Sequence, residues 1–202
     1  MIFVIVPLGK TASDIRFWVV RAIIYIIGST LGGLSVGLLV SALGGLLHGL
    51  FQNIIVAGLA LGLLTLLYAA YEVGWLRMPA PQSNWQVPNS WGVEHHIGGT
   101  LLYGYTLGAG VFTFIPYASF YVLLGWYLLA GDLATGILLG ALYGLARGVF
   151  VLTGGLVEMR GRSLIQFNSW LLDRKWQLKL VNGAYLFFIA AFLLTAVMLL
   201  RK

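Results

Sequence analysis

Long apolar stretches separated by short polar ones dominate the chain. A helix needs about 20 mostly apolar residues to cross the hydrocarbon core of a membrane. The pattern therefore predicts an all-α, polytopic integral membrane helix bundle with about five transmembrane helices. They cover residues 23–47, 54–76, 98–130, 133–157 and 181–200.

Three details refine this pattern. An interfacial segment at 17–22, interrupted by Arg21, leads into the first helix, and Pro116 is expected to kink the overlong third one. The polar segment after the fourth helix contains an amphipathic stretch at 164–172, which predicts a helix lying on the membrane surface. Glycines spaced four apart, such as Gly28 and Gly32, favour close packing of helix backbones.

Short motifs recur at nearly constant spacing, which predicts an internal two-helix repeat, although apolar segments also resemble one another by composition alone. Two helices in each repeat half would keep both halves in the same orientation, related about an axis along the membrane normal. The predicted organisation is an N-terminal cytoplasmic or interfacial segment (1–22), a first half (23–97), a second half (98–180) and a fifth helix with the C-terminus (181–202). The motif pairs are Gly28-x-Thr30-Leu31-Gly32 with Gly104-x-Thr106-Leu107-Gly108, Ala57-Gly58-x-x-Leu61-Gly62 with Thr135-Gly136-x-x-Leu139-Gly140, and Asn89-Ser90-Trp91 with Asn168-Ser169-Trp170.

Composition supports a membrane location. Hydrophobic residues make up 60% of the chain and charged residues 9%, whereas a soluble domain carries about 25% charged residues. The absence of cysteine excludes disulfides, thiolate chemistry and cysteine-ligated metal or haem. The net charge of +6 does not predict nucleic-acid binding, because the basic residues flank the apolar stretches instead of forming one patch.

The same basic residues predict the topology, because cytoplasmic loops are enriched in Lys and Arg. With five crossings, nine basic residues fall on the N-terminal side and two on the other. We therefore predict a multi-pass protein of the plasma membrane with a cytoplasmic N-terminus and an external C-terminus. The nine are Lys10, Arg16, Arg21, Arg77, Arg160, Arg162, Arg174, Lys175 and Lys179, and the two are Arg201 and Lys202.

Arg147 is the leading candidate for a binding residue, because it lies within the fourth predicted helix. An arginine at the centre of a membrane helix costs about 2.5–3.5 kcal/mol on insertion scales, which implies a partner, a polar cavity or a function. It could bind an anionic substrate, with Tyr143 one turn earlier on the same face, or have a structural partner, either Glu72 or backbone carbonyls freed near a glycine. Glu72 is itself a candidate, and its structural alternatives are extension toward the membrane interface and pairing with Arg77.

Histidine is the remaining candidate for a cofactor ligand. His48, His95 and His96 could each ligate haem or a chlorophyll magnesium, although solvated histidines would look the same in sequence. His95 and His96 are adjacent and point about 100° apart on a helix, so they do not chelate one ion together. The chain contains no catalytic triad, paired carboxylates, phosphate-binding loop or metal-ligand cluster, so we predict neither an enzyme nor a metal site.

Two resemblances add to this interpretation. The motifs Gln86-Val87-x-x-x-Trp91, Tyr103-Gly-x-x-Leu107-Gly-x-Gly110-x-x-Thr113 and Gly144-Leu-Ala-Arg147-Gly resemble a group of uncharacterised bacterial polytopic membrane proteins. That resemblance implies a membrane architecture and no particular activity. The glycine-rich first helices are also similar to the superfamily of lysine exporters and thiol–disulfide interchange membrane domains. This chain lacks the paired cysteines of the redox members, and a three-helix inverted repeat would conflict with the two-helix repeat.

Two functions are compatible with these features. The first is a small transporter or permease, with Arg147 and the glycine-rich helices lining a path. The alternative is an accessory or scaffold subunit of a larger membrane complex, such as one that holds pigment or haem. The expected partners are the lipid bilayer and either further copies of the chain or other membrane subunits.

Overall fold

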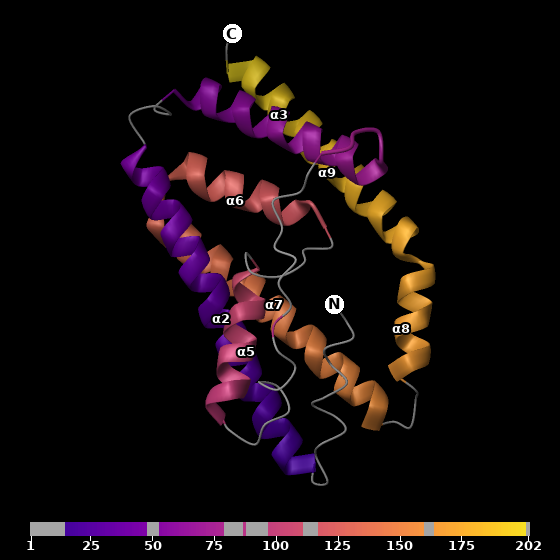
Figure 1. Cartoon of the computed structure of the whole chain (residues 1–202). Coiled ribbons are helices and arrows are strands. Elements are labelled where there is room, and N and C mark those ends of the chain that lie inside the picture. Colours follow the sequence, from indigo (N-terminus) through magenta and orange to yellow (C-terminus); the bar gives the residue numbers. More distant parts are fainter. Residues whose placement is uncertain are drawn as a thin grey trace. The chain divides into compact units, whose positions relative to one another are not determined.

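The computed structural model describes residues 15–47, 53–78, 87, 97–110, 117–159 and 164–200. All regular elements in these residues are α-helices, so the all-α prediction is confirmed. Three of them are long and apolar enough to cross a membrane, over Arg16–Leu46, Ile54–Val73 and Lys175–Leu200. The helices are α2 (Ile15–Leu46), α3 (Ile54–Val73), α5 (Ile97–Ala109), α6 (Ser119–Ala130), α7 (Leu133–Met159), α8 (Leu164–Asp173) and α9 (Lys175–Leu200) (Figure 1).

The third predicted helix differs most from the sequence-based expectation. A single kinked helix was predicted over 98–130, but the structure has two helices, α5 and α6, with a break between them. Gly110 follows the last residue of α5 and has a φ of 73°, a left-handed conformation that ends the helix. Pro116, the expected kink, lies outside the described residues. The amphipathic stretch at 164–172 does form a helix, α8.

The chain divides into two compact units that each draw on distant parts of the sequence. Unit 1 comprises residues 1–36, 82–114 and 137–173, and unit 2 comprises residues 37–81, 115–136 and 174–202. Each unit contains residues from both predicted repeat halves, so the compact units do not follow the repeat. Common ancestry of the two halves stays a prediction, and its third motif at 89–91 lies outside the described residues.

In unit 1, α2 packs directly on the backbones of α5 and α7. A Cβ atom added at Gly108 would lie 2.0 Å from the carbonyl oxygen of Ser29, and one added at Gly144 would lie 2.1 Å from the same oxygen. Only glycine permits such approaches, because a side chain would collide with main-chain atoms. The Ser29 hydroxyl also donates to the Gly144 carbonyl at 2.7 Å, which fixes the register of α2 and α7.

The α2–α5 contact is symmetric under exchange of the two helices. A Cβ at Gly28 would meet the Leu101 carbonyl oxygen at 2.2 Å, and a Cβ at Gly104 would meet the Tyr25 carbonyl oxygen at 2.3 Å. Adding 76 to 25 and 28 gives 101 and 104, the offset that relates the first motif pair. The two glycine motifs therefore pack against each other as parallel, equivalent partners.

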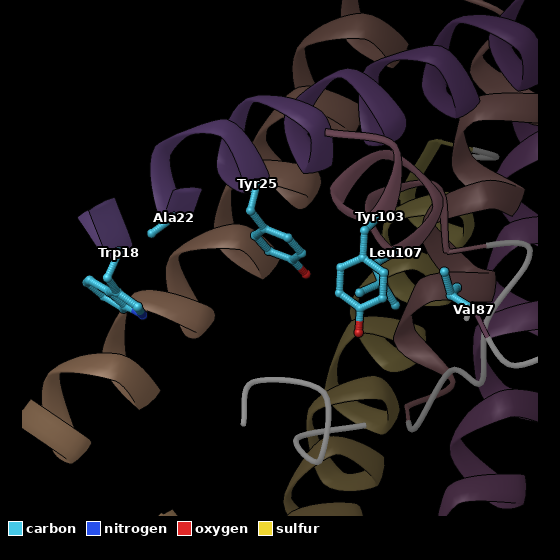
Figure 2. Packing of buried hydrophobic residues seen from close by; sticks show 6 residues of the cluster. All are labelled: Trp18, Ala22, Tyr25, Val87, Tyr103 and Leu107. Carbon is cyan, nitrogen blue, oxygen red and sulfur yellow. The ribbon is translucent and has the colours of Figure 1, made fainter. Parts of the chain in front are cut away.

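An aromatic cluster covers one side of this glycine contact. Tyr25 of α2 and Tyr103 of α5 lie with ring centroids 6.0 Å apart. Figure 2 shows both side chains extending from their helices beside Leu107 and Val87, with Trp18 farther along α2. Tyr103 is 1% exposed, so the cluster is the hydrophobic core of unit 1.

In unit 2, α3 lies antiparallel to α9 and to α6, and side chains fill these contacts. Gly62 of α3 faces Leu194 of α9, where an added Cβ would lie 2.7 Å from a leucine methyl group instead of from main chain. Tyr68 of α3 stacks on Tyr121 of α6 with centroids 5.2 Å apart. These contacts bury the face of α3 that carries Thr65, Ala69 and Glu72.

Local signals in the sequence explain where α3 and α7 begin and end. Asn53 precedes α3, and its side-chain oxygen accepts a hydrogen bond from the Ile55 amide at 2.9 Å. Gly74 ends α3 in a left-handed conformation with a φ of 86°. Asp132 precedes α7 and accepts hydrogen bonds from both the amide and the hydroxyl of Thr135. These bonds lower the pKa of the Asp132 carboxyl below its usual value.

Candidate functional site

The most unusual polar residue in the described structure is Glu72, in the last turn of α3. Its side chain is 1% exposed, although a carboxylate is among the groups least often fully buried. α3 carries it on the same face as Thr65 and Ala69, toward α9 and the N-terminal end of α6. Such a group requires compensation by charge or hydrogen bonds, because burying an isolated carboxylate is very costly.

Two donors hold one oxygen of this carboxylate. Oε1 of Glu72 accepts the backbone N–H of Ala118 at 2.5 Å and the side-chain amide of Asn182 at 2.9 Å. Ala118 is the N-cap residue of α6, so the carboxylate lies at the positive end of that helix dipole. Glu72 therefore ties together α3, α9 and the start of α6.

The other oxygen is less well satisfied. Oε2 has no hydrogen-bond partner and is fully buried. The ammonium group of Lys179 is close by, with its Nζ 3.9 Å from Oε2, beyond normal hydrogen-bond distance. The same Nζ lies 5.9 Å from the ring centroid of Tyr71, and the Lys179 side chain is 26% exposed. The ammonium thus balances the charge of Glu72 from the edge of the site without donating to it.

This arrangement corrects the sequence-based expectations for Glu72. Pairing with Arg77 was the expected structural alternative, but the carboxylate is oriented toward Lys179 instead, and Arg77 is exposed. Pairing with Arg147, the other alternative, stays a prediction. The sequence analysis missed Asn182. A polar amide one turn after Lys179 on the same helix was the available signal.

Arg147 lies on α7 and is partly buried. Its Nη1 donates to the Tyr143 hydroxyl at 2.9 Å, as the four-residue spacing predicts for one helix face. The guanidinium is therefore in contact with the Tyr143 hydroxyl, and its binding of an anionic ligand stays a prediction.

The three histidines, His48, His95 and His96, lie outside the described residues, so their candidacy as cofactor ligands is untested. Among the residues that the structure describes, no three His, Asp or Glu side chains gather as a metal site would require. Two candidate binding sites therefore lie within the described residues. One is Glu72 with Asn182 and Lys179 in unit 2, and the other is the Arg147–Tyr143 pair in unit 1.

Comparison with known proteins identifies relatives along nearly the whole chain. The chain is 30% identical over 189 residues to the methylamine utilization protein MauF of Paracoccus versutus, covering 92% of this chain and 66% of that protein. It is 30% identical over 200 residues to MauF of Methylophilus methylotrophus, covering 96% and 67% of the two chains. It is also 31% identical over 177 residues to MauF of Methylorubrum extorquens, covering 84% and 58%.

The chain belongs to the MauF family. It spans about two thirds of the length of the MauF proteins of Paracoccus versutus and Methylophilus methylotrophus. No family model matches the chain, and no solved structure matches it. The full name of these relatives is methylamine utilization protein MauF. The resemblances to lysine exporters and to the uncharacterised membrane group stay predictions.

Proposed function

We propose that this chain is a membrane-embedded accessory protein of methylamine utilization. It works with other proteins of that process and does not itself carry a substrate across the membrane. The observation that carries the proposal is the 30% identity to a methylamine utilization protein over 96% of the chain. That relation favours the accessory function over transport, the first of the two functions inferred from the sequence.

The directions of the packed helices support a chain that crosses the plasma membrane five times. The first and third predicted crossings begin with α2 and α5, which run parallel, because Gly28 packs on Leu101 and Gly32 on Tyr105. The second and fifth, α3 and α9, run antiparallel. Alternating crossings require both relations, so the proposal assigns the short helices α5 and α6, together with the longer α7, to crossings.

Reporter fusions test this topology. Alkaline phosphatase is active only outside the cytoplasm, so we expect activity when it is fused after Lys202 and none when it is inserted near Pro81. Activity at both positions, or at neither, would contradict the five-crossing arrangement with a cytoplasmic N-terminus.

A growth and uptake experiment tests the accessory function. The gene for this chain is disrupted in its host, and two quantities are measured: growth on methylamine and initial uptake of radiolabelled methylammonium. We expect growth on methylamine to fail while uptake continues at the wild-type rate, and plasmid-borne wild type to restore growth. Normal growth of the disrupted strain would overturn the proposal, and a parallel loss of uptake would establish transport instead.

A further inference from the structure

The environment of Glu72 has the composition of a site for a primary ammonium ion. The Oε2 oxygen is buried, charged and without a hydrogen-bond donor. The ring centroid of Tyr71 lies 5.9 Å from the Lys179 ammonium, and aromatic faces attract ammonium groups through their quadrupole. Within the site, the Lys179 side chain already places one alkylammonium group in this position, 3.9 Å from Oε2.

The orientation of the carboxylate is fixed independently of that ammonium. Asn182 and the Ala118 amide both donate to Oε1, so Oε2 stays directed at the ammonium position when the ammonium moves. Lys179 enters from the edge and is 26% exposed, so its head group can turn to solvent without disturbing a packed core. A free cation replacing it keeps the net charge of the site unchanged.

The packing around the carboxylate limits the size of the ligand. A Cβ atom added at Gly183 would lie 2.6 Å from a methyl group of Val73 and 3.5 Å from the Cβ of Glu72. α3 and α9 are therefore in close contact at Glu72 itself, which favours a ligand with a small substituent on its ammonium nitrogen.

We propose that Glu72, Tyr71 and Asn182 form a binding site for a small primary alkylammonium ion, which Lys179 occupies in the absence of ligand. The free ion donates a hydrogen bond to Oε2 that Lys179 at 3.9 Å does not make. Lys179 acts as a tethered competitor, so the affinity of the wild type is moderate and rises when the tether is removed. The choice of methylammonium as the ligand rests on the proposed function, whereas the ammonium chemistry rests on the site.

The test uses the full chain in mild detergent, with thermal unfolding followed by tryptophan fluorescence. Methylammonium chloride is titrated against sodium chloride and tetramethylammonium chloride at equal ionic strength. We expect saturable stabilisation by methylammonium alone. Lys179→Met should lower the half-saturating concentration by at least about tenfold, because a tethered group competes at a high effective concentration. The matched control Lys175→Met alters an exposed lysine one turn earlier and should leave the half-saturating concentration unchanged.

Glu72→Gln keeps an acceptor for Asn182 and Ala118 but removes the charge, and it should abolish the stabilisation. Equal stabilisation by tetramethylammonium, retention of the effect in Glu72→Gln, or an unchanged half-saturating concentration in Lys179→Met would overturn the proposal. If Lys179→Met does not fold, equilibrium dialysis of radiolabelled methylammonium with the wild type and with Glu72→Gln decides, and equal binding to both would overturn it.

Failure of this site and failure of the accessory function give different results. Absence of methylammonium binding together with lost growth on methylamine removes the site and leaves the accessory function. Glu72-dependent binding together with normal growth of the disrupted strain supports the site and removes the accessory function.

Discussion

The α2–α5–α7 contact of unit 1 and the α3–α6–α9 contact of unit 2 are held together in different ways. In the first, an added Cβ at Gly32 or Gly108 would collide with carbonyl oxygens of the facing helix, at 2.1 and 2.0 Å. In the second, an added Cβ at Gly58 or Gly62 would meet the ends of valine and leucine side chains, at 2.5 and 2.7 Å.

This difference determines how each contact tolerates change. Main-chain atoms cannot move without shifting a whole helix, whereas a leucine methyl group can rotate away. The α2–α5–α7 contact therefore depends on shape. Serine hydroxyls of α2 add hydrogen bonds to the neighbouring helices, from Ser29 to the Gly144 carbonyl and from Ser35 to the Tyr105 hydroxyl. The α3–α6–α9 contact depends on side-chain volume and on one buried, charged cluster, so its sensitive point is chemical.

The largest expected effect is that of a methyl group added to the α2–α5 contact. Gly108→Ala should cost about 3 kcal/mol, the upper end of typical overpacking costs, because its Cβ would lie against main chain. The matched change Gly62→Ala should alter stability by less than about 1 kcal/mol, since a leucine side chain can yield and alanine favours helix. Apparent melting temperatures in detergent measure both. Equal effects at the two positions would remove the distinction between the contacts.

Loss of the buried carboxylate should have a comparable effect in unit 2. Glu72→Ala leaves the Asn182 amide and the Ala118 N–H without their acceptor, and each buried donor left unsatisfied costs about 1–3 kcal/mol. Replacing both Glu72 and Lys179 by Met removes the two charges together, so its cost should be smaller than the sum of the costs of the two single changes to Met. Additive effects of the two single changes, measured by chemical or thermal unfolding, would show that the residues are not coupled.

A smaller effect is expected for Ser29→Ala, which keeps the Cβ but removes the hydrogen bond to Gly144. Hydrogen bonds between membrane helices contribute about 0.6–2 kcal/mol. Thr195→Ala is the control, because the Thr195 hydroxyl bonds only within its own helix and is exposed. The melting temperature should fall for Ser29→Ala and stay nearly constant for Thr195→Ala; the opposite order would contradict the role given to Ser29.

The smallest effect concerns the cap of α7 and depends on pH. Because hydrogen bonds from Thr135 lower the folded-state pKa of Asp132, its contribution to stability is present above the unfolded pKa and is lost as pH falls through the folded value. At neutral pH, Asp132→Ala should melt slightly below the wild type, and the gap should close at a pH well below the usual aspartate pKa of about 3.9. A gap that persists at that pH would show that the carboxylate charge is not what stabilises the cap.

The sequence predicted the helices well because hydrophobic pattern and local end signals determine them. Asn53 and Gly74 set the limits of α3, and the turn at Gly131 and Asp132 separates α6 from α7. The end of α5 at Gly110 was not predicted, since proline is a stronger sequence signal than one more glycine in a glycine-rich run. The kink expected at Pro116 stays a prediction. Gly110 is recognisable as a helix end only from its backbone conformation.

The candidate site could be predicted only in part. Glu72 was recognisable because a carboxylate in an apolar helix is costly. Its partners were not, since Lys179 and Asn182 are more than 100 residues away and adjoin it only through the packing of α9 on α3. The Arg147–Tyr143 bond was predictable because it lies within one helix.

Purification of the affinity-tagged chain from methylamine-grown membranes in mild detergent tests the central claim most directly. An accessory protein of methylamine utilization should co-purify with other proteins of that process in a fixed molar ratio, measured by quantitative mass spectrometry. The ratio should persist in Lys175→Met, which alters only an exposed lysine. Recovery of the chain solely as a homo-oligomer, with none of those proteins, would contradict the account.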